Sequence, residues 1–130
     1  MPCGCSVEMK TAALLRKGDD SAVAERAVWA CSWWSRTRGM IGRSFAREAF
    51  DAMVFEKCNA IHCCWMGEAI DVLFLDSRWQ VVKCCSSVKP WCFAWGGKQA
   101  AITVELPEGT VERTGIVPGD CLKTELLPAQ

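Results

Sequence analysis

The chain has 130 residues and a formal net charge of zero, because 15 Lys and Arg balance 15 Asp and Glu. This length is typical of one domain, so we draw no boundary within residues 1–130. Zero net charge argues against an overall basic protein, and we expect no nucleic acid among the partners. No run approaches the roughly 20 apolar residues that a membrane-spanning helix requires. The first residues lack the apolar segment of a secretory signal, so we expect a cytoplasmic protein without a membrane span.

Ten cysteines are many for a chain of this length and raise the question of disulfides or metal. Most of them lie inside apolar, strand-like runs rather than in loops. Free cysteine packs as a small hydrophobic residue. We therefore predict that most are reduced core residues, with disulfides or a metal site as the alternative.

The N-terminal third contains two expected strands and an expected helical lid. Residues 1–6 are expected to be frayed. Val7–Arg16 and Ala22–Ala30 are predicted strands, joined by a Gly- and Asp-containing turn, although the Ala-rich second segment also suits a helix. Short helical segments at Arg36–Ile41 and Phe45–Phe50, each preceded by a serine suited to N-capping, would fold onto the sheet.

The remainder of the chain is a succession of short strands separated by Gly-, Pro- and Asp-containing turns. The predicted strands are Ala52–Phe55, Ile61–Met66, Ile70–Leu75, Trp79–Ser86, Ala100–Glu105 and Cys121–Leu126. Many short strands at close spacing indicate a β-sandwich or barrel. Ile70–Leu75 is apolar at both parities, which predicts a central strand that is covered on both faces.

Several segments, in order, resemble one known family. They are SRTRGMIGR (35–43), MVF (53–55), IHCCWM (61–66), IDVLFLD (70–76), KPW (89–91), ELPEG (105–109) and TGIVPGD (114–120). Together they cover about residues 30–122 and are similar to the prokaryotic "domain of unknown function 192" family.

This resemblance implies a compact, mainly β, jelly-roll-like domain with one or two short helices, and it implies no established activity. Family members are small stand-alone domains, cytoplasmic or exported, and some are encoded near surface-appendage assembly genes. The chain departs from the family pattern at Cys63-Cys64-Trp65 and at Glu68-Ala69. Site chemistry is therefore not carried over to this loop.

His62 is the sole histidine, so any chemistry that needs an imidazole depends on it. One interpretation is a binding or acid–base residue beside Asp71, whose carboxylate would orient the ring or raise its pKa. The other is a structural histidine that holds the preceding loop. Asp71 itself lies in a buried strand and needs a partner, for which an arginine or a backbone amide is favoured.

A metal site is weakly indicated. Extended backbone rises about 3.3 Å per residue, so Cys58 and His62 would lie too far apart for one zinc ion. His62 and Cys64 alone are suitably spaced, and they would need help from Cys84 or Cys85 on a neighbouring strand. The chain contains no C-x-x-C pair. Cys64, two residues from His62, and Cys92, in the loop after Pro90, are the candidate nucleophiles, but no motif typical of a catalytic thiol surrounds either, which argues against an enzyme of that class.

Two further groups have a functional and a structural interpretation. Arg36, Arg43 and Arg47 would share one face of a continuous helix and suit an anion or an acidic partner. They also suit a solvated face, or an internal ion pair in which Arg36 or Arg43 meets Asp71 or Glu105. The second group is the tryptophans near loops, which suit a pocket, a partner surface or the core; it comprises Trp33, Trp34, Trp91 and Trp95.

We therefore expect a mainly β, jelly-roll-like sandwich or barrel that acts as a non-catalytic module, binds a small ligand or a protein partner, and carries no cofactor. The expected site lies at the mouth of the sandwich beneath the lid, and its residues are Arg36, Arg43, His62, Trp65, Met66 and Asp71. Two alternatives stay open. One is a Cys/His site for metal or redox chemistry, and the other is a hydrolase or transferase of unknown substrate.

Overall fold

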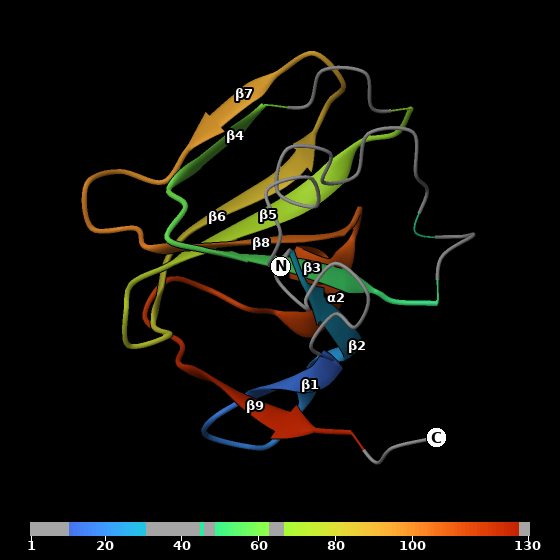
Figure 1. The fold of residues 1–130 in the computed structure, drawn as a ribbon, viewed down its shortest axis with the longest axis vertical. Coiled ribbons are helices and arrows are strands. Elements are labelled where there is room, and N and C mark those ends of the chain that lie inside the picture. Colours follow the sequence, from blue (N-terminus) through green and yellow to red (C-terminus); the bar gives the residue numbers. More distant parts are fainter. Residues whose placement is uncertain (1–10, 31–44, 46–48, 63–66, 128–130) are drawn as a thin grey trace, which may run out of the picture.

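The structure is a computed structural model that describes residues 11–30, 45, 49–62 and 67–127 (Figure 1). It confirms the mainly β fold. The strands are β1 (Thr11–Arg16), β2 (Ala22–Trp29), β3 (Ala52–Glu56), β4 (Ala60–His62), β5 (Ile70–Leu75), β6 (Val81–Val88), β7 (Phe93–Trp95), β8 (Ile102–Pro107) and β9 (Leu122–Leu126), and a short helix, α2 (Thr110–Thr114), precedes β9.

The strands form two sheets of unequal size. The main sheet has seven strands in the order β6-β5-β8-β3-β2-β1-β9, and a small two-stranded sheet consists of β4 and β7. All pairs are antiparallel except β2 with β3, which run parallel. β5 pairs with β6 on one side and β8 on the other, so it is an internal strand next to the sheet edge rather than at its centre.

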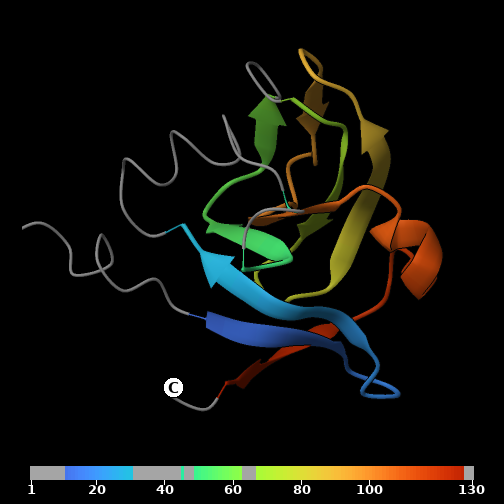
Figure 2. The same cartoon turned by 90° about the vertical axis from the view of Figure 1, so that its right-hand side faces the viewer.

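The main sheet curls until its two edge strands meet at one end. An isolated bridge joins Gln80 to Cys121, just before β6 and β9 begin. Two backbone hydrogen bonds flank this bridge, from Val81 N–H to Asp120 O at 2.8 Å and from Leu122 N–H to Trp79 O at 2.9 Å. The contact is local, so the sheet forms a strongly curved layer and does not close into a barrel (Figures 1 and 2).

The curvature gives the sheet two separately covered apolar faces. Leu73 and Leu75 of β5 belong to the cluster on the α2 side, with Val104 and Leu106 of β8. The intervening residues of β5, which are Ile70, Val72 and Phe74, belong to a second cluster with Ile61 of β4 and Ala94 of β7. Coverage of β5 on both faces, as its sequence predicts, is therefore confirmed.

The small sheet lies tightly on the second face. A Cβ atom at Gly96, the residue after β7, would lie 2.4 Å from Cγ of Phe74. A side chain at this position is excluded, because such a separation is well inside van der Waals contact. Glycine at position 96 thus lets the backbone after β7 rest directly on the Phe74 ring.

The sequence does not predict β7 or α2. β7 is too short for its alternation to be distinguished from a loop, and α2 is too short to show helical periodicity. The turn at Pro118-Gly119 agrees with the sequence. Gly119 has φ 101° and Asp120 N–H donates to Val117 O at 3.1 Å, as expected for a type II turn.

Candidate functional site

Asp71 is a buried carboxylate whose two oxygens both accept backbone hydrogen bonds. Oδ1 accepts from Ser87 N–H at 2.9 Å, and Oδ2 accepts from Val111 N–H at 2.8 Å. The pairing of β5 with β6 changes register at this point, and Ser87 has φ 54°, so its amide needs a partner outside the regular ladder. Val111 lies in the first turn of α2, where amides have no partner within the helix.

These contacts give Asp71 a structural role. The carboxylate ties β5 to the irregular end of β6 and to the start of α2. They agree with the expectation that a backbone amide satisfies this group. A cavity of about 260 Å³ lies beside Asp71 and is lined by Ser86, Ser87, Glu108, Gly109 and Glu112.

The expected pairing of Asp71 with His62 involves opposite faces of the main sheet. Asp71 shares its parity on β5 with Leu73 and Leu75, which face the α2 side. β4, the strand that ends at His62, packs through Ile61 against the other face. The carboxylate of Asp71 therefore faces away from β4.

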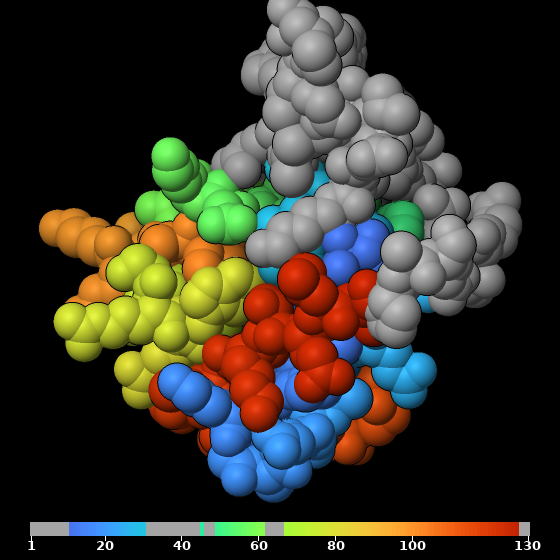
Figure 3. Space-filling view, turned by 60° about the horizontal axis from the view of Figure 1, so that its bottom comes forward, coloured from blue at the N-terminus to red at the C-terminus, as the bar shows by residue number. Residues whose placement is uncertain are grey.

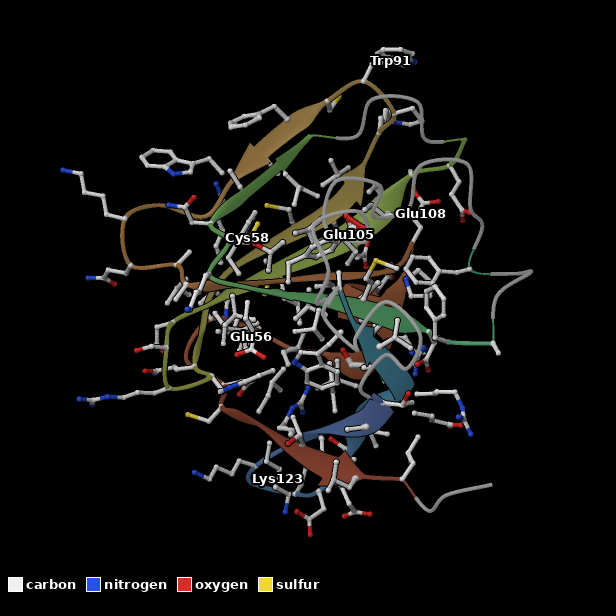
Figure 4. The ribbon with its side chains drawn as sticks, viewed as in Figure 1. Glu56, Cys58, Trp91, Glu105, Glu108 and Lys123 are labelled. Carbon is white, nitrogen blue, oxygen red and sulfur yellow. The ribbon has the colours of Figure 1, made fainter. Side chains whose placement is uncertain are left out.

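Glu105 of β8 is the buried carboxyl group on the β4 side. Met53 of β3 and Val72 of β5 are its direct cross-strand neighbours, and both are fully buried. Cross-strand neighbours project from the same face, so Glu105 lies in an apolar row. Glu105, which is labelled in Figure 4, is 4% exposed, and its Oε1 atom has no hydrogen-bond partner among the described residues.

The surroundings of Glu105 favour its protonated form. Burial raises the pKa of this carboxyl group from 4.5 to about 8, because a charge would lie in an apolar environment. Thr103, two residues earlier on the same face, is by contrast satisfied by Cys58 O at 2.8 Å. At neutral pH the Glu105 carboxyl group is therefore mostly a neutral donor and acceptor.

The sequence predicts Glu105 only as an ion-pair partner, and the reason lies in its strand. In ITVELP, Ile102, Val104 and Leu106 alternate with Thr103 and Glu105. This pattern is typical of a strand with one solvated face. In the structure both Thr103 and Glu105 are buried, and no local signal in β8 indicates it.

Five of the candidate residues, Arg36, Arg43, Cys64, Trp65 and Met66, lie outside the described residues. For His62 the structure describes the backbone alone, at the end of β4 opposite Phe93. These positions stay predictions. Of the site predicted from sequence, the structure thus describes Asp71 in full and the strand that carries His62.

The described cysteines are free thiols. Burial raises the pKa of Cys84 to about 11 and also raises that of Cys85, and raised values make both thiols poor nucleophiles. Within the described part of the chain, no three His, Cys, Asp or Glu residues lie close enough to hold a metal ion.

Large aromatic side chains gather on the outer side of β7 and on the turn before it. Trp91 is 61% exposed, Phe93 68% and Trp95 49%. Ala94, between the last two, is buried beneath the small sheet. Two of the four tryptophans that the sequence places near loops are thus on the surface.

Comparison with known proteins agrees with this architecture. A family model, DUF192 (Uncharacterized ACR, COG1430), matches residues 14–124. The chain belongs to this family. It is 39% identical over 64 residues to the UPF0127 protein PF1050 of Pyrococcus furiosus, and the match spans 49% of this chain and 54% of that protein. The family name describes no activity.

Two solved structures share the fold. A candidate transcription regulator from Sinorhizobium meliloti 1021 superposes with a TM-score of 0.73 at 20% identity, over 89% of this chain and 93% of its own. A protein of unknown function from Novosphingobium aromaticivorans DSM 12444 gives 0.70 at 17% identity, over 95% and 92%. Separately, no helix among the described residues is long and apolar enough to cross a membrane.

Proposed function

We propose that this chain is a non-catalytic β domain that binds a small ligand on the face of the main sheet beneath β4 and β7, with Glu105 as the anchoring residue. The supporting observation is the buried Glu105 carboxyl group, whose Oε1 atom has no partner among the described residues. An unmet buried polar atom costs roughly 1–3 kcal/mol. A ligand that hydrogen-bonds to Oε1 would recover that free energy on binding.

The protonation state of Glu105 indicates the ligand class. A neutral carboxyl group offers one donor and one acceptor, which suits an amide, a carboxylic acid or a vicinal pair of hydroxyl and carbonyl groups. The surrounding side chains, Met53 and Val72, suit an apolar body. A small uncharged ligand with one polar end therefore fits better than a cation or a phosphate.

The proposed site replaces Asp71 with Glu105 and keeps the other predicted residues as further contacts. Asp71 already satisfies two amides on the other face. Arg36, Arg43, His62, Trp65 and Met66 remain predictions. One competing arrangement is an ion pair between Arg36 or Arg43 and Glu105, which would keep the carboxyl group ionised at neutral pH.

Three variants test the proposal. Glu105→Leu removes both hydrogen-bonding functions, Glu105→Gln keeps a donor and an acceptor, and Glu108→Gln changes an exposed carboxylate nearby as the matched control. Native mass spectrometry of the purified protein, followed by a thermal-shift screen of small polar molecules, identifies ligands. We expect roughly tenfold weaker binding for Glu105→Leu, a smaller loss for Glu105→Gln and none for the control.

Two results would contradict the proposal. The first is that the purified wild-type protein carries no small molecule and that every molecule that stabilises it binds Glu105→Leu equally well. The other is a carboxyl resonance of Glu105 that titrates in the ordinary range, as an ion pair with arginine requires. Stoichiometric metal that is lost in His62→Ala would instead support the Cys/His alternative.

A further inference from the structure

A second surface lies on the outside of the small sheet, and its side chains differ in chemistry from those of the proposed site. Phe93 and Trp95 are two residues apart on β7, so their side chains project from the same face about 7 Å apart. Both are exposed, in contrast to Ala94 between them. The part of the chain that includes β7 and the loop after it projects from one side of the molecule (orange in Figure 3).

Trp91 extends this exposed aromatic row from the turn before β7. Cys92 N–H donates to Lys89 O at 3.1 Å, and Trp91 has φ 68° after Pro90. This is the third position of a type II turn, where glycine is favoured. A left-handed conformation costs a residue with a side chain about 1 kcal/mol. The turn thus holds a large ring outward, at the tip of the molecule, at a cost in backbone energy (Figure 4).

The same stretch is basic, although the whole chain is neutral. Residues 77–104 contain Arg78, Lys83, Lys89 and Lys98 and no Asp or Glu. Lys83 Nζ donates to the carbonyl oxygen of Trp95 at 2.8 Å, which places this ammonium group beside β7. Lys89 precedes Trp91 and Lys98 follows β7 in the sequence, and both are exposed, so a surface lysine flanks the aromatic row on each side along the chain.

We propose that this aromatic–lysine surface binds single-stranded nucleic acid; it comprises Lys83, Lys89, Trp91, Phe93, Trp95 and Lys98. Bases stack on the exposed rings and the lysines neutralise phosphates. Exposed aromatic side chains with flanking positive charge are what sequence-independent single-strand binders use. Zero net charge excludes an overall basic protein, and it does not exclude a local surface of this kind.

The same surface fits a protein partner less well. Lysine is depleted in protein–protein interfaces, whereas it commonly contacts the phosphate groups of nucleic acids. The energetically dominant side chains of protein interfaces also fill pockets. Phe93 and Trp95 are instead exposed, at 68% and 49%, as stacking with bases requires.

The test is fluorescence anisotropy of labelled oligothymidylate and oligouridylate, each about 12 nucleotides long, at several salt concentrations. We expect affinity to fall with salt, with a log–log slope near −2 for three lysine contacts. Phe93→Ala and Trp95→Ala should each weaken binding roughly tenfold, because each removes one stacking ring. Lys98→Gln should reduce the slope by about 0.7 and leave the fold unchanged.

Matched controls use β9, away from this surface. Leu126→Ala removes another exposed hydrophobic side chain and Lys123→Gln another exposed lysine, and neither should change binding. Glu105→Leu should also bind the oligonucleotide normally, which separates this proposal from the proposed ligand site. Circular dichroism verifies the fold of each variant.

Three results would overturn the inference. The first is no binding of either oligonucleotide at low salt. The second is binding that the β9 controls reduce as much as Phe93→Ala, Trp95→Ala and Lys98→Gln do. The third is a preference for a duplex or for an acidic peptide such as polyglutamate, which would assign the surface to a different class of partner.

Discussion

Asp71 and Glu105 are buried carboxyl groups on adjacent strands, yet their environments differ completely. Asp71 is 1% exposed and accepts hydrogen bonds from two backbone amides. Glu105 is 4% exposed, lies among apolar side chains and leaves Oε1 without a partner among the described residues. Both carboxyl groups are therefore buried to a similar degree. Their hydrogen bonding distinguishes Asp71, a structural carboxylate, from Glu105, a candidate binding group.

The difference comes from what covers each face of the sheet. The α2 face is covered by a helix start and an irregular strand end, both of which have free amides to donate. The other face is covered by Ile61, Ala94 and the backbone at Gly96. The backbone N–H and C=O groups of the small sheet largely hydrogen-bond to each other. Asp71 is satisfied on the first face, whereas Glu105 Oε1 on the second has no partner within the described part of the chain.

The largest expected effect comes from removing Asp71. Asp71→Ala leaves the buried amides of Ser87 and Val111 without acceptors, so we expect a loss of about 3 kcal/mol in the free energy of unfolding. Urea denaturation followed by tryptophan fluorescence measures it. Asp71→Asn keeps one acceptor and should lose less. Equal stability of Asp71→Ala and wild type would refute the structural role.

Opening the other face should have the next largest effect. Gly96→Ala places a Cβ atom against the Phe74 ring, and we expect a loss of about 2 kcal/mol. The displaced small sheet should also admit water and lower the pKa of Glu105 toward its ordinary value. Gly18→Ala, at a turn position with open space, is the control. A loss of stability with no change in that pKa would show that the small sheet is not what buries Glu105.

Replacing Glu105 with an apolar side chain should act in the opposite direction to Asp71→Ala. Glu105→Leu exchanges an unmet polar group for a side chain of similar size, and we expect a gain of about 1.5 kcal/mol near neutral pH. The same urea titration measures it. Destabilisation instead would show that Glu105 has a stabilising partner, and the contrast with Asp71 would then fail.

The last expected effect is a pH dependence of stability that Glu105 contributes. Its pKa is about 8 in the folded protein and near 4.5 when exposed, so between these values the folded state binds a proton that the unfolded state releases. Stability should therefore fall as pH rises through this window, by roughly 1 kcal/mol per pH unit. Glu105→Gln should remove this component. An identical pH profile in the variant would contradict the raised pKa.

Much of the fold follows from local patterns. The apolar run Ile70–Leu75 predicts a strand with the observed bounds that is covered on both faces. The turn at 17–20 and the Pro118-Gly119 turn are also where the sequence indicates them. These features depend on neighbouring residues, whose turn preferences and hydrophobic periodicity are visible in one sequence. β7 and α2 escaped prediction because each is too short to show its period.

The candidate site depends on contacts between distant parts of the chain. The sequence correctly indicates that Asp71 needs a partner, for which an arginine or a backbone amide is favoured, because an unpaired carboxylate in an apolar strand is costly. It cannot indicate which face of the sheet β4 covers, since that depends on how two sheets pack. The predicted pairing of His62 with Asp71 depends on proximity along the chain, and proximity does not determine which face of a pleated strand a side chain projects from.

By itself, then, the sequence determined the family, the mainly β class, the apolar strand Ile70–Leu75 that is covered on both faces and several turns, because these depend on residue order and local conformational preference. Only the tertiary structure decided the environment of Glu105. In isolation the strand ITVELP predicts a solvated glutamate. In the folded chain Glu105 is buried beside Met53 and Val72, which raises the pKa of the carboxyl group and turns a surface pattern into the candidate binding site.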